Sequence, residues 1–157
     1  MVSAMQAGAG ELKDVAAKAA PSLILPTLAG ESVDLKALRG KVVLVNFWAV
    51  WCPPCRKEMP SMNRLAASLG GKPFIILGVN AGDEPAAIHA FMDKVPVEFP
   101  IVMDAEGVSL KAWRAFVFPT SYVVDKQGRL RMGLVGSIEW DAPETVARIE
   151  ALLNEAD

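Results

Sequence analysis

The chain has 157 residues, of which 52% are hydrophobic and 22% charged, and its formal net charge is −2. This length and composition suit one globular domain with a real core. The small net charge and the scattered basic residues argue against nucleic acid or a membrane surface as a partner. The sequence contains no apolar run long enough to cross a bilayer and no glycine-rich phosphate loop.

The first twenty residues are interpreted as a lead-in to the domain. The segment 1–10 lacks a basic start followed by an apolar core, and it is interpreted as an added start or a processed end. Residues 11–20 are compatible with a short amphipathic helix ended by Pro21, but we prefer a loosely ordered lead-in. The expected organisation is therefore a flexible or processed segment 1–20 and a domain 21–157.

The rest of the chain alternates predicted strands with predicted helices. The strands are expected at 23–25, 32–34, 41–49, 74–79, 101–103, 120–124 and 130–135. The helices are expected at 35–39, 53–69, 86–93, 108–115 and 143–155. This alternation predicts an α/β sandwich, with a central mixed β-sheet and helices on both of its faces.

Three local signals refine this prediction. Two short strands around Ala29-Gly30 favour a small hairpin before the first central strand. Pro60 lies inside a predicted helix and is expected to bend its axis. Gly128 closes a turn between the last two strands, where a left-handed residue is needed, so these strands are predicted to form a hairpin.

The two cysteines, Cys52 and Cys55, lie where a buried strand ends and a helix begins. A disulfide that closes so short a loop contributes little stability, so chemistry explains this pair better than architecture. The positive end of the helix dipole stabilises a thiolate at such a position. We expect Cys52 to be exposed and to attack, and Cys55 to lie buried one turn inside the helix and to resolve the mixed disulfide.

The two residues between the cysteines should tune the thiolate. Pro53 and Pro54 have no N–H group to donate to the Cys52 sulfur, which leaves the Cys55 N–H and the helix dipole. Stabilisation of the Cys52 thiolate should therefore be moderate. A reduced form that is only moderately stabilised predicts a protein that acts as a reductant.

Several motifs resemble a known family. Trp51-Cys52-Pro53-Pro54-Cys55, followed by Pro60, resembles the active-site helix of the thioredoxin superfamily, and Phe118-Pro119-Thr120 resembles its cis-proline loop. Residues 79–83 and 89–92 resemble the insert of the TlpA/ResA-like thiol–disulfide oxidoreductases. The similarity covers roughly residues 21–155. It implies a thioredoxin-like fold with an N-terminal hairpin extension and a central αβ insert.

The resemblance also implies roles for single residues. Pro119 should be cis, face the dithiol, keep metals away and offer backbone pairing to a client chain. Trp51 should shield the disulfide, and Pro53, Pro54 and Phe118 complete the surface that faces a client.

A buried acid is a further expectation from the resemblance. Asn46 occupies the position where thioredoxin has a buried acid, and the TlpA/ResA-like branch takes its acid from the insert. Asp83 is the match, with Glu84 beside it, and we expect Asp83 to pass a proton to Cys55.

The resemblance further implies a protein disulfide reductase without a cofactor or metal. Its partners would be disulfide-containing clients, for example in cytochrome c or copper-centre maturation, and an upstream dithiol donor. The protein is expected to be a periplasmic monomer, with a signal or anchor that this sequence does not show.

Other interpretations stay open at this point. The cysteine pair could be half of a metal site, but a closed zinc site needs about four ligands, and His89 lies mid-helix with no role assigned. Asp83 and Glu84 equally fit a helix N-terminal region before Pro85. Trp48, Trp113 and Trp140 are interpreted as core residues.

Three alternative functions use the same scaffold. A peroxiredoxin-like peroxidase needs a threonine three residues before its reactive cysteine, where this chain has Ala49. A copper carrier needs a wider cysteine spacing and a histidine on a facing loop. A non-catalytic binding module is the third alternative.

Overall fold

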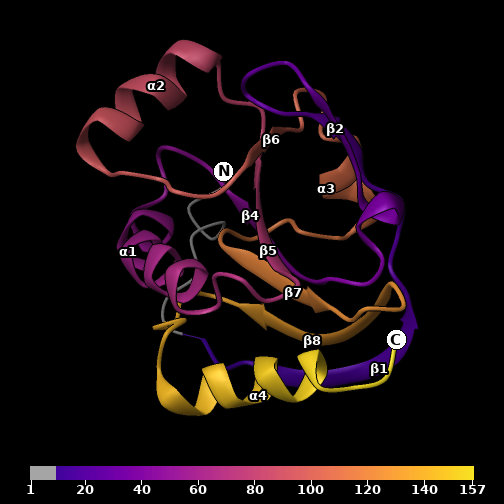
Figure 1. Cartoon of the computed structure of the whole chain (residues 1–157). Helices are drawn as coiled ribbons and strands as arrows, with labels where there is room; N and C mark the ends of the chain where they lie inside the picture. Colours follow the sequence, from indigo (N-terminus) through magenta and orange to yellow (C-terminus); the bar gives the residue numbers. More distant parts are fainter. Residues whose placement is uncertain (1–9) are drawn as a thin grey trace.

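The computed structural model describes residues 10–157, which form an α/β sandwich around a six-stranded sheet (Figure 1). The strands are β1 (Lys13–Ala19), β2 (Ile24–Pro26), β3 (Ser32–Asp34), β4 (Val42–Trp48), β5 (Phe74–Asn80), β6 (Ile101–Met103), β7 (Thr120–Val124) and β8 (Arg129–Val135). The helices are η2 (Leu35–Leu38), α1 (Pro53–Ser68), α2 (Pro85–Lys94), α3 (Val108–Ala112) and α4 (Pro143–Leu153).

The central sheet is mixed, as predicted. Its strand order is β1-β8-β7-β4-β5-β6, and β4, β5 and β6 run parallel while β7, β8 and β1 add antiparallel pairs. Every residue of β4 is buried, since both faces of this strand are covered. The carboxyl end of this central strand leads into the dithiol.

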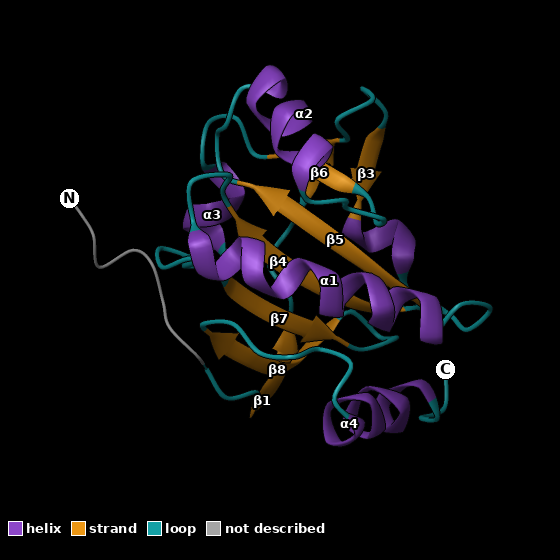
Figure 2. Ribbon diagram, turned by 90° about the vertical axis from the view of Figure 1, so that its left-hand side faces the viewer, coloured by secondary structure: helices purple, strands orange, loops and turns teal. Residues whose placement is uncertain are grey.

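Helices cover both faces of the sheet. Figure 2 shows α1 and α4 on the near side and α3 behind the sheet, while α2 lies beside the β5–β6 end. Phe91 of α2 packs against Trp48 at the end of β4, with ring centroids 5.0 Å apart. The αβ insert therefore contacts the core just before the dithiol. No helix among residues 10–157 is long and apolar enough to span a membrane.

The N-terminal prediction is wrong for residues 13–19. These residues form β1, which pairs antiparallel with β8 through an irregular register between Asp14 and Lys18. All seven residues of β1 are exposed, so the segment lacks the alternating apolar pattern that would have indicated a strand. Backbone pairing to β8 holds it instead. The interpretation of 1–10 as a processed end falls almost wholly on residues outside the described part of the chain.

The smaller predictions are mostly confirmed. Strands β2 and β3 form the predicted two-stranded hairpin. Pro60 lies inside α1, and the bend expected there stays a prediction. Gly128 has a φ of 81°, the left-handed conformation expected at the β7–β8 turn. Helix α3 ends at Ala112, three residues before the predicted end, and Arg114 then adopts a left-handed φ of 56°.

A buried carboxylate holds the β7–β8 hairpin, which carries the residues after Pro119. Asp125 accepts hydrogen bonds from the backbone N–H groups of Gln127 and Arg129 and from the guanidinium groups of Arg129 and Arg131. Burial acts to raise the pKa of Asp125, but these hydrogen bonds outweigh it and hold the pKa below its usual value. The stabilisation is therefore present above the unfolded pKa near 3.8 and is lost as the pH falls through the lower folded value.

We expect Asp125→Ala to lower the free energy of unfolding by about 1–3 kcal/mol, because several donors around a buried site lose their acceptor. Urea denaturation at pH 7 measures the loss. Asp157→Ala is the matched control, because Asp157 pairs with Lys126 of the same turn but is itself exposed. Equal stability of the two variants would contradict the role given to Asp125.

Candidate active site

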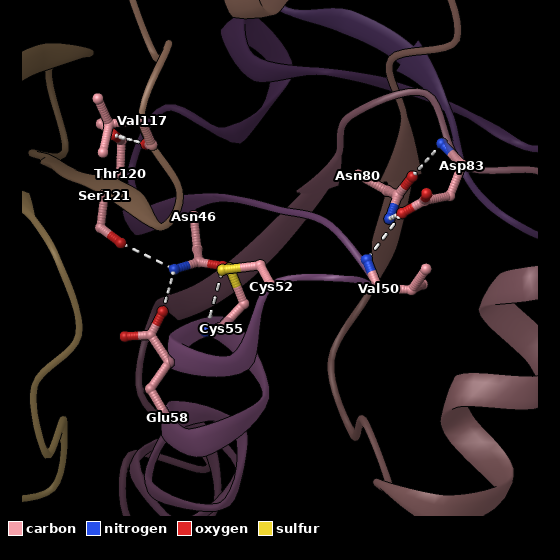
Figure 3. The surroundings of a disulfide bond; sticks show 10 residues. All are labelled: Asn46, Val50, Cys52, Cys55, Glu58, Asn80, Asp83, Val117, Thr120 and Ser121. Carbon is pink, nitrogen blue, oxygen red and sulfur yellow. Dashed lines mark hydrogen bonds between the residues drawn. A yellow bond between two sulfur atoms is a disulfide. The ribbon is translucent and has the colours of Figure 1, made fainter. Parts of the chain in front are cut away.

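The cysteine pair lies at the first turn of α1, as predicted from the sequence. Cys52 is the N-cap residue, and its Sγ accepts a hydrogen bond from the Cys55 N–H at 3.3 Å. Pro53 and Pro54 occupy the first two helical positions and have no N–H group to donate. The expectation that the Cys55 N–H alone serves the Cys52 sulfur from this turn is confirmed. The two cysteines form a disulfide in this structure (Figure 3).

The predicted exposure of Cys52 is wrong for the disulfide form. Both cysteines have 0% of their surface exposed. The Cys52 sulfur is turned inward, because it is bonded to Cys55 and also accepts the Cys55 N–H. Trp51 beside it is 47% exposed, so the accessible surface at this point belongs to a flanking aromatic ring rather than to sulfur.

The loop before β7 lies beside Trp51. The peptide bond between Phe118 and Pro119 is cis, and both residues are buried. The Phe118 ring lies against Trp51, with ring centroids 5.8 Å apart. The Pro119 carbonyl accepts a hydrogen bond from the Gly136 N–H, and the Thr120 hydroxyl donates to the Val117 carbonyl. The fold thus brings residues 51 and 118, far apart in the sequence, into contact.

Asp83 has a different position from the one expected of a proton donor to Cys55. Its Oδ2 accepts the Val50 N–H at 2.8 Å and the Asn80 side-chain N–H at 3.0 Å. The Asp83 N–H in turn donates to Asn80 Oδ1. Figure 3 shows this cluster apart from the sulfurs, on the far side of Val50. The carboxylate of Asp83 therefore fixes the segment that leads into Cys52.

We expect Asp83→Ala to weaken this segment without changing the proton chemistry of the thiols. The free energy of unfolding should fall by about 1 kcal/mol, since the Val50 N–H loses its acceptor. The pH profile of thiol alkylation should keep its midpoint. Glu84→Ala is the control, because Glu84 is exposed and makes no capping hydrogen bond to α2. A displaced midpoint in Asp83→Ala alone would restore Asp83 to the proton path.

A second acid, Glu58, lies one turn after Cys55 on α1. Positions i and i+3 share a helix face, so the Glu58 and Cys55 side chains both face β4. Glu58 is buried, and this burial raises its pKa from 4.5 to about 7, although hydrogen bonds from Trp140 and Asn46 oppose the shift. A carboxyl group with that pKa can both take up and release a proton near neutral pH.

A buried polar network surrounds Glu58. Trp140 Nε1 donates to Glu58 Oε1 at 2.8 Å, and Asn46 Nδ2 donates to Glu58 Oε2 at 3.0 Å. Asn46 Nδ2 also donates to Ser121 Oγ at 2.8 Å. Three parts of the chain therefore position one carboxyl group: β4, β7 and the segment before α4.

Glu58 is not among the residues predicted from the sequence, although its position on α1 carries a signal. On α1 the buried residues include Cys55, Met59, Met62 and Leu65, which mark the helix face toward the core. Glu58 lies on that same face, and an acid at a core position of a helix is unusual enough to indicate function. Trp140 was correctly predicted as a core residue, but its indole N–H also serves this acid.

The remaining candidates do not join the site. His89 is exposed on α2. Among residues 10–157, no three histidine, cysteine, aspartate or glutamate side chains lie close enough together to hold a metal ion.

Comparisons with known proteins agree with this geometry. The family model described as "AhpC/TSA family" matches residues 16–132. The thiol-disulfide oxidoreductase ResA of Bacillus thuringiensis is 34% identical over 119 residues, which cover 76% of this chain and 69% of that protein. The thioredoxin-like protein YneN of Bacillus subtilis is 37% identical over 122 residues, which cover 76% of this chain and 71% of YneN.

Solved structures show the same relationship. The structure of a putative thiol:disulfide interchange protein DsbE from Chlorobium tepidum superimposes with a TM-score of 0.80 at 32% identity, covering 88% of this chain and 97% of that one. A putative thioredoxin from Neisseria meningitidis gives a TM-score of 0.78 at 30% identity and covers 90% of this chain and 94% of its own. The chain therefore belongs to the AhpC/TSA family, among the thioredoxin-like thiol–disulfide oxidoreductases related to ResA and DsbE.

Proposed function

We propose that this oxidoreductase reduces disulfides in client proteins, with Cys52 as the attacking sulfur and Cys55 as the resolving sulfur. The observation that carries the proposal is the position of the pair at the N-terminus of α1, where Cys52 Sγ accepts the Cys55 N–H. That N–H and the helix dipole both stabilise negative charge on Cys52 after reduction. Cys55 lies within bonding distance of the same sulfur, as its disulfide demonstrates.

The reaction proceeds in two exchange steps. The Cys52 thiolate attacks one sulfur of a client disulfide, forms a mixed disulfide and releases the other client sulfur as a thiolate. Cys55 then loses its proton to Glu58 and attacks Cys52 Sγ, which forms the Cys52–Cys55 disulfide and releases the second client thiolate. An upstream dithiol donor must return two electrons and two protons to complete the cycle.

Three exposed apolar side chains lie next to Cys52 or next to the cis-proline loop, and they suggest the kind of client segment that binds. Trp51, Phe116 and Val135 are 47%, 48% and 57% exposed, and Val135 pairs with Thr120 in the β7–β8 register. Exposed apolar groups on the segments that flank a reactive centre favour an apolar, extended client segment. Because the Pro119 carbonyl is already bonded to the Gly136 N–H, backbone pairing to the client is assigned to Phe118.

We also propose a reducing role outside the cytoplasm, in which a monomer acts on clients such as those of cytochrome c or copper-centre maturation. A DsbE-like disulfide oxidoreductase described as secreted, from Mycobacterium tuberculosis, is 26% identical with a TM-score of 0.71, which supports this location. The two prolines support the reducing direction, because only one N–H of this turn reaches Cys52.

Two measurements test these proposals. The reduced protein should reduce a disulfide-bonded peptide in the presence of dithiothreitol, and absence of turnover would contradict the function itself. Equilibration with glutathione buffers should give a reduction potential well below the value of about −120 mV that marks a strong oxidant. A potential near that value would contradict the reducing direction alone.

A further inference from the structure

The side-chain amide of Asn46 has one end paired and one end unpaired inside the core. Its Nδ2 donates to Glu58 Oε2 and to Ser121 Oγ. Its Oδ1 is buried and has no hydrogen-bond partner. Figure 3 shows the nitrogen directed toward Glu58 and the other end of the amide on the side of the disulfide. A buried acceptor without a donor costs free energy, so this oxygen requires an explanation.

The redox state of Cys55 supplies that explanation. In the disulfide, Cys55 has no S–H group and offers no donor to the amide. After reduction, Cys55 carries an S–H group, and it shares a helix face with Glu58, the acid that Asn46 already contacts. The unpaired oxygen is then an acceptor for the thiol proton.

The network also has a second complete pairing. If Glu58 is protonated, its O–H group needs an acceptor, and a half-turn of the Asn46 amide presents Oδ1 to Glu58 and to the Ser121 hydroxyl. The same half-turn presents Nδ2 to the sulfur, where it donates to a thiolate. The terminal torsion of an asparagine side chain is soft, so this reversal is accessible. The first pairing satisfies the amide when Cys55 carries the proton, and the second satisfies it when Glu58 carries the proton.

We propose that Asn46 is a positioning residue whose amide reverses as a proton moves from the Cys55 thiol to Glu58. The inference rests on the proposed function and adds a residue to its second step. The proton leaves Cys55 Sγ and arrives at Glu58 Oε2, so one negative charge moves from the carboxylate to the sulfur. The resulting thiolate is the form that attacks Cys52 in the mixed disulfide.

Few other ionisable groups face this exchange. From α1 and its N-cap these are the reduced thiols of Cys55 and Cys52, and from the segment before α4 it is Glu139, whose negative charge acts to raise the pKa of Glu58. Asn46 on β4, Ser121 on β7 and Trp140 contribute neutral polar groups. Among the described residues, Glu58 is therefore the one ionisable acceptor that is hydrogen-bonded to the Asn46 amide.

The test uses Cys52→Ala protein, in which Cys55 is the only thiol, so its outcome does not depend on client reduction. The rate of Cys55 alkylation by iodoacetamide is measured from pH 5 to pH 10. Adding Asn46→Leu should lower the rate at pH 7 about tenfold, the factor that corresponds to one pKa unit. Glu58→Gln should then have no further effect. Unchanged Cys55 reactivity in Asn46→Leu, or fully additive effects of the two changes, would overturn the inference.

Ser61→Ala is the matched structural control. Ser61 is buried, and its hydroxyl donates to the Glu58 backbone carbonyl and accepts the backbone N–H of Trp140, but it makes no hydrogen bond to the amide of Asn46. This variant should lower stability and leave the Cys55 alkylation profile in place. A shift as large as that of Asn46→Leu would mean that loosening of the core explains both.

A second measurement needs no variant and does not depend on folding of Asn46→Leu. In protein labelled with ¹⁵N at asparagine, the Asn46 side-chain NH₂ signals should shift between the oxidised and reduced forms. In the reduced form they should move with pH along the same curve as Cys55 ionisation. Signals that stay constant through that transition would overturn the inference even if every variant failed to fold.

Discussion

Cys52→Ser is expected to reduce no disulfide above the uncatalysed rate, whereas Cys55→Ser should accumulate a covalent adduct between Cys52 and its client. The difference follows from the proposed order of the two exchange steps, in which only Cys52 attacks the client and only Cys55 releases it. Incubation with a disulfide-bonded peptide, followed by mass spectrometry without reductant, detects the adduct. Its mass should exceed that of the variant by one client chain.

Because both cysteines are buried, the experiment is needed to tell the attacking sulfur from the resolving one. Neither sulfur is exposed in the disulfide form, so burial alone does not distinguish them. The assignment depends on the N-cap position of Cys52 and its hydrogen bond from the Cys55 N–H. Adducts that form in Cys52→Ser but not in Cys55→Ser would reverse the roles. Lys57→Ala serves as the control, because Lys57 is exposed on the same helix.

The fold was predictable where burial and turn chemistry left a pattern in the sequence. The continuous apolar run of β4 indicated a strand covered on both faces, and the glycine at position 128 indicated the hairpin turn. Strand β1 left no such pattern. Its side chains are exposed, and backbone hydrogen bonds to β8 hold it, so no alternation of apolar and polar residues was required.

The site was predictable in its sulfur chemistry and not in its acid. The sequence around Cys52 and Cys55 indicated the N-terminus of a helix. The two prolines between them indicated that only the Cys55 N–H of this turn donates to the Cys52 sulfur. The acid required tertiary contacts, because Glu58 is buried only when Trp140 and Asn46 pack around it from distant parts of the chain. Asp83 matched a family pattern by position, yet its carboxylate binds the Val50 N–H.

Glu58→Gln should slow the resolving step and remove the dependence of its rate on pH near neutrality. A positioned acid–base group raises a rate about 10²–10⁴-fold. We expect the rate of the resolving step to fall by the lower value, about 10²-fold, because the Cys55 thiol can still lose its proton to water at higher pH. Single-turnover decay of the mixed disulfide measures this step directly. A loss confined to the first exchange step would contradict the assignment.

The same variant tests the buried acid through stability. Because the folded-state pKa of Glu58, about 7, exceeds its unfolded value of 4.5, the stabilisation from this group is complete below pH 4.5 and is lost as the pH rises through 7. A shift of this size corresponds to a loss of about 3 kcal/mol between those limits. Urea denaturation of the oxidised protein from pH 5 to pH 9 should show this fall in the wild type and not in Glu58→Gln. Glu139→Gln, which removes a neighbouring negative charge, should instead keep the fall and move its midpoint to slightly lower pH, because that charge acts to raise the pKa of Glu58. A midpoint that moves to higher pH would contradict this account of the Glu58 pKa.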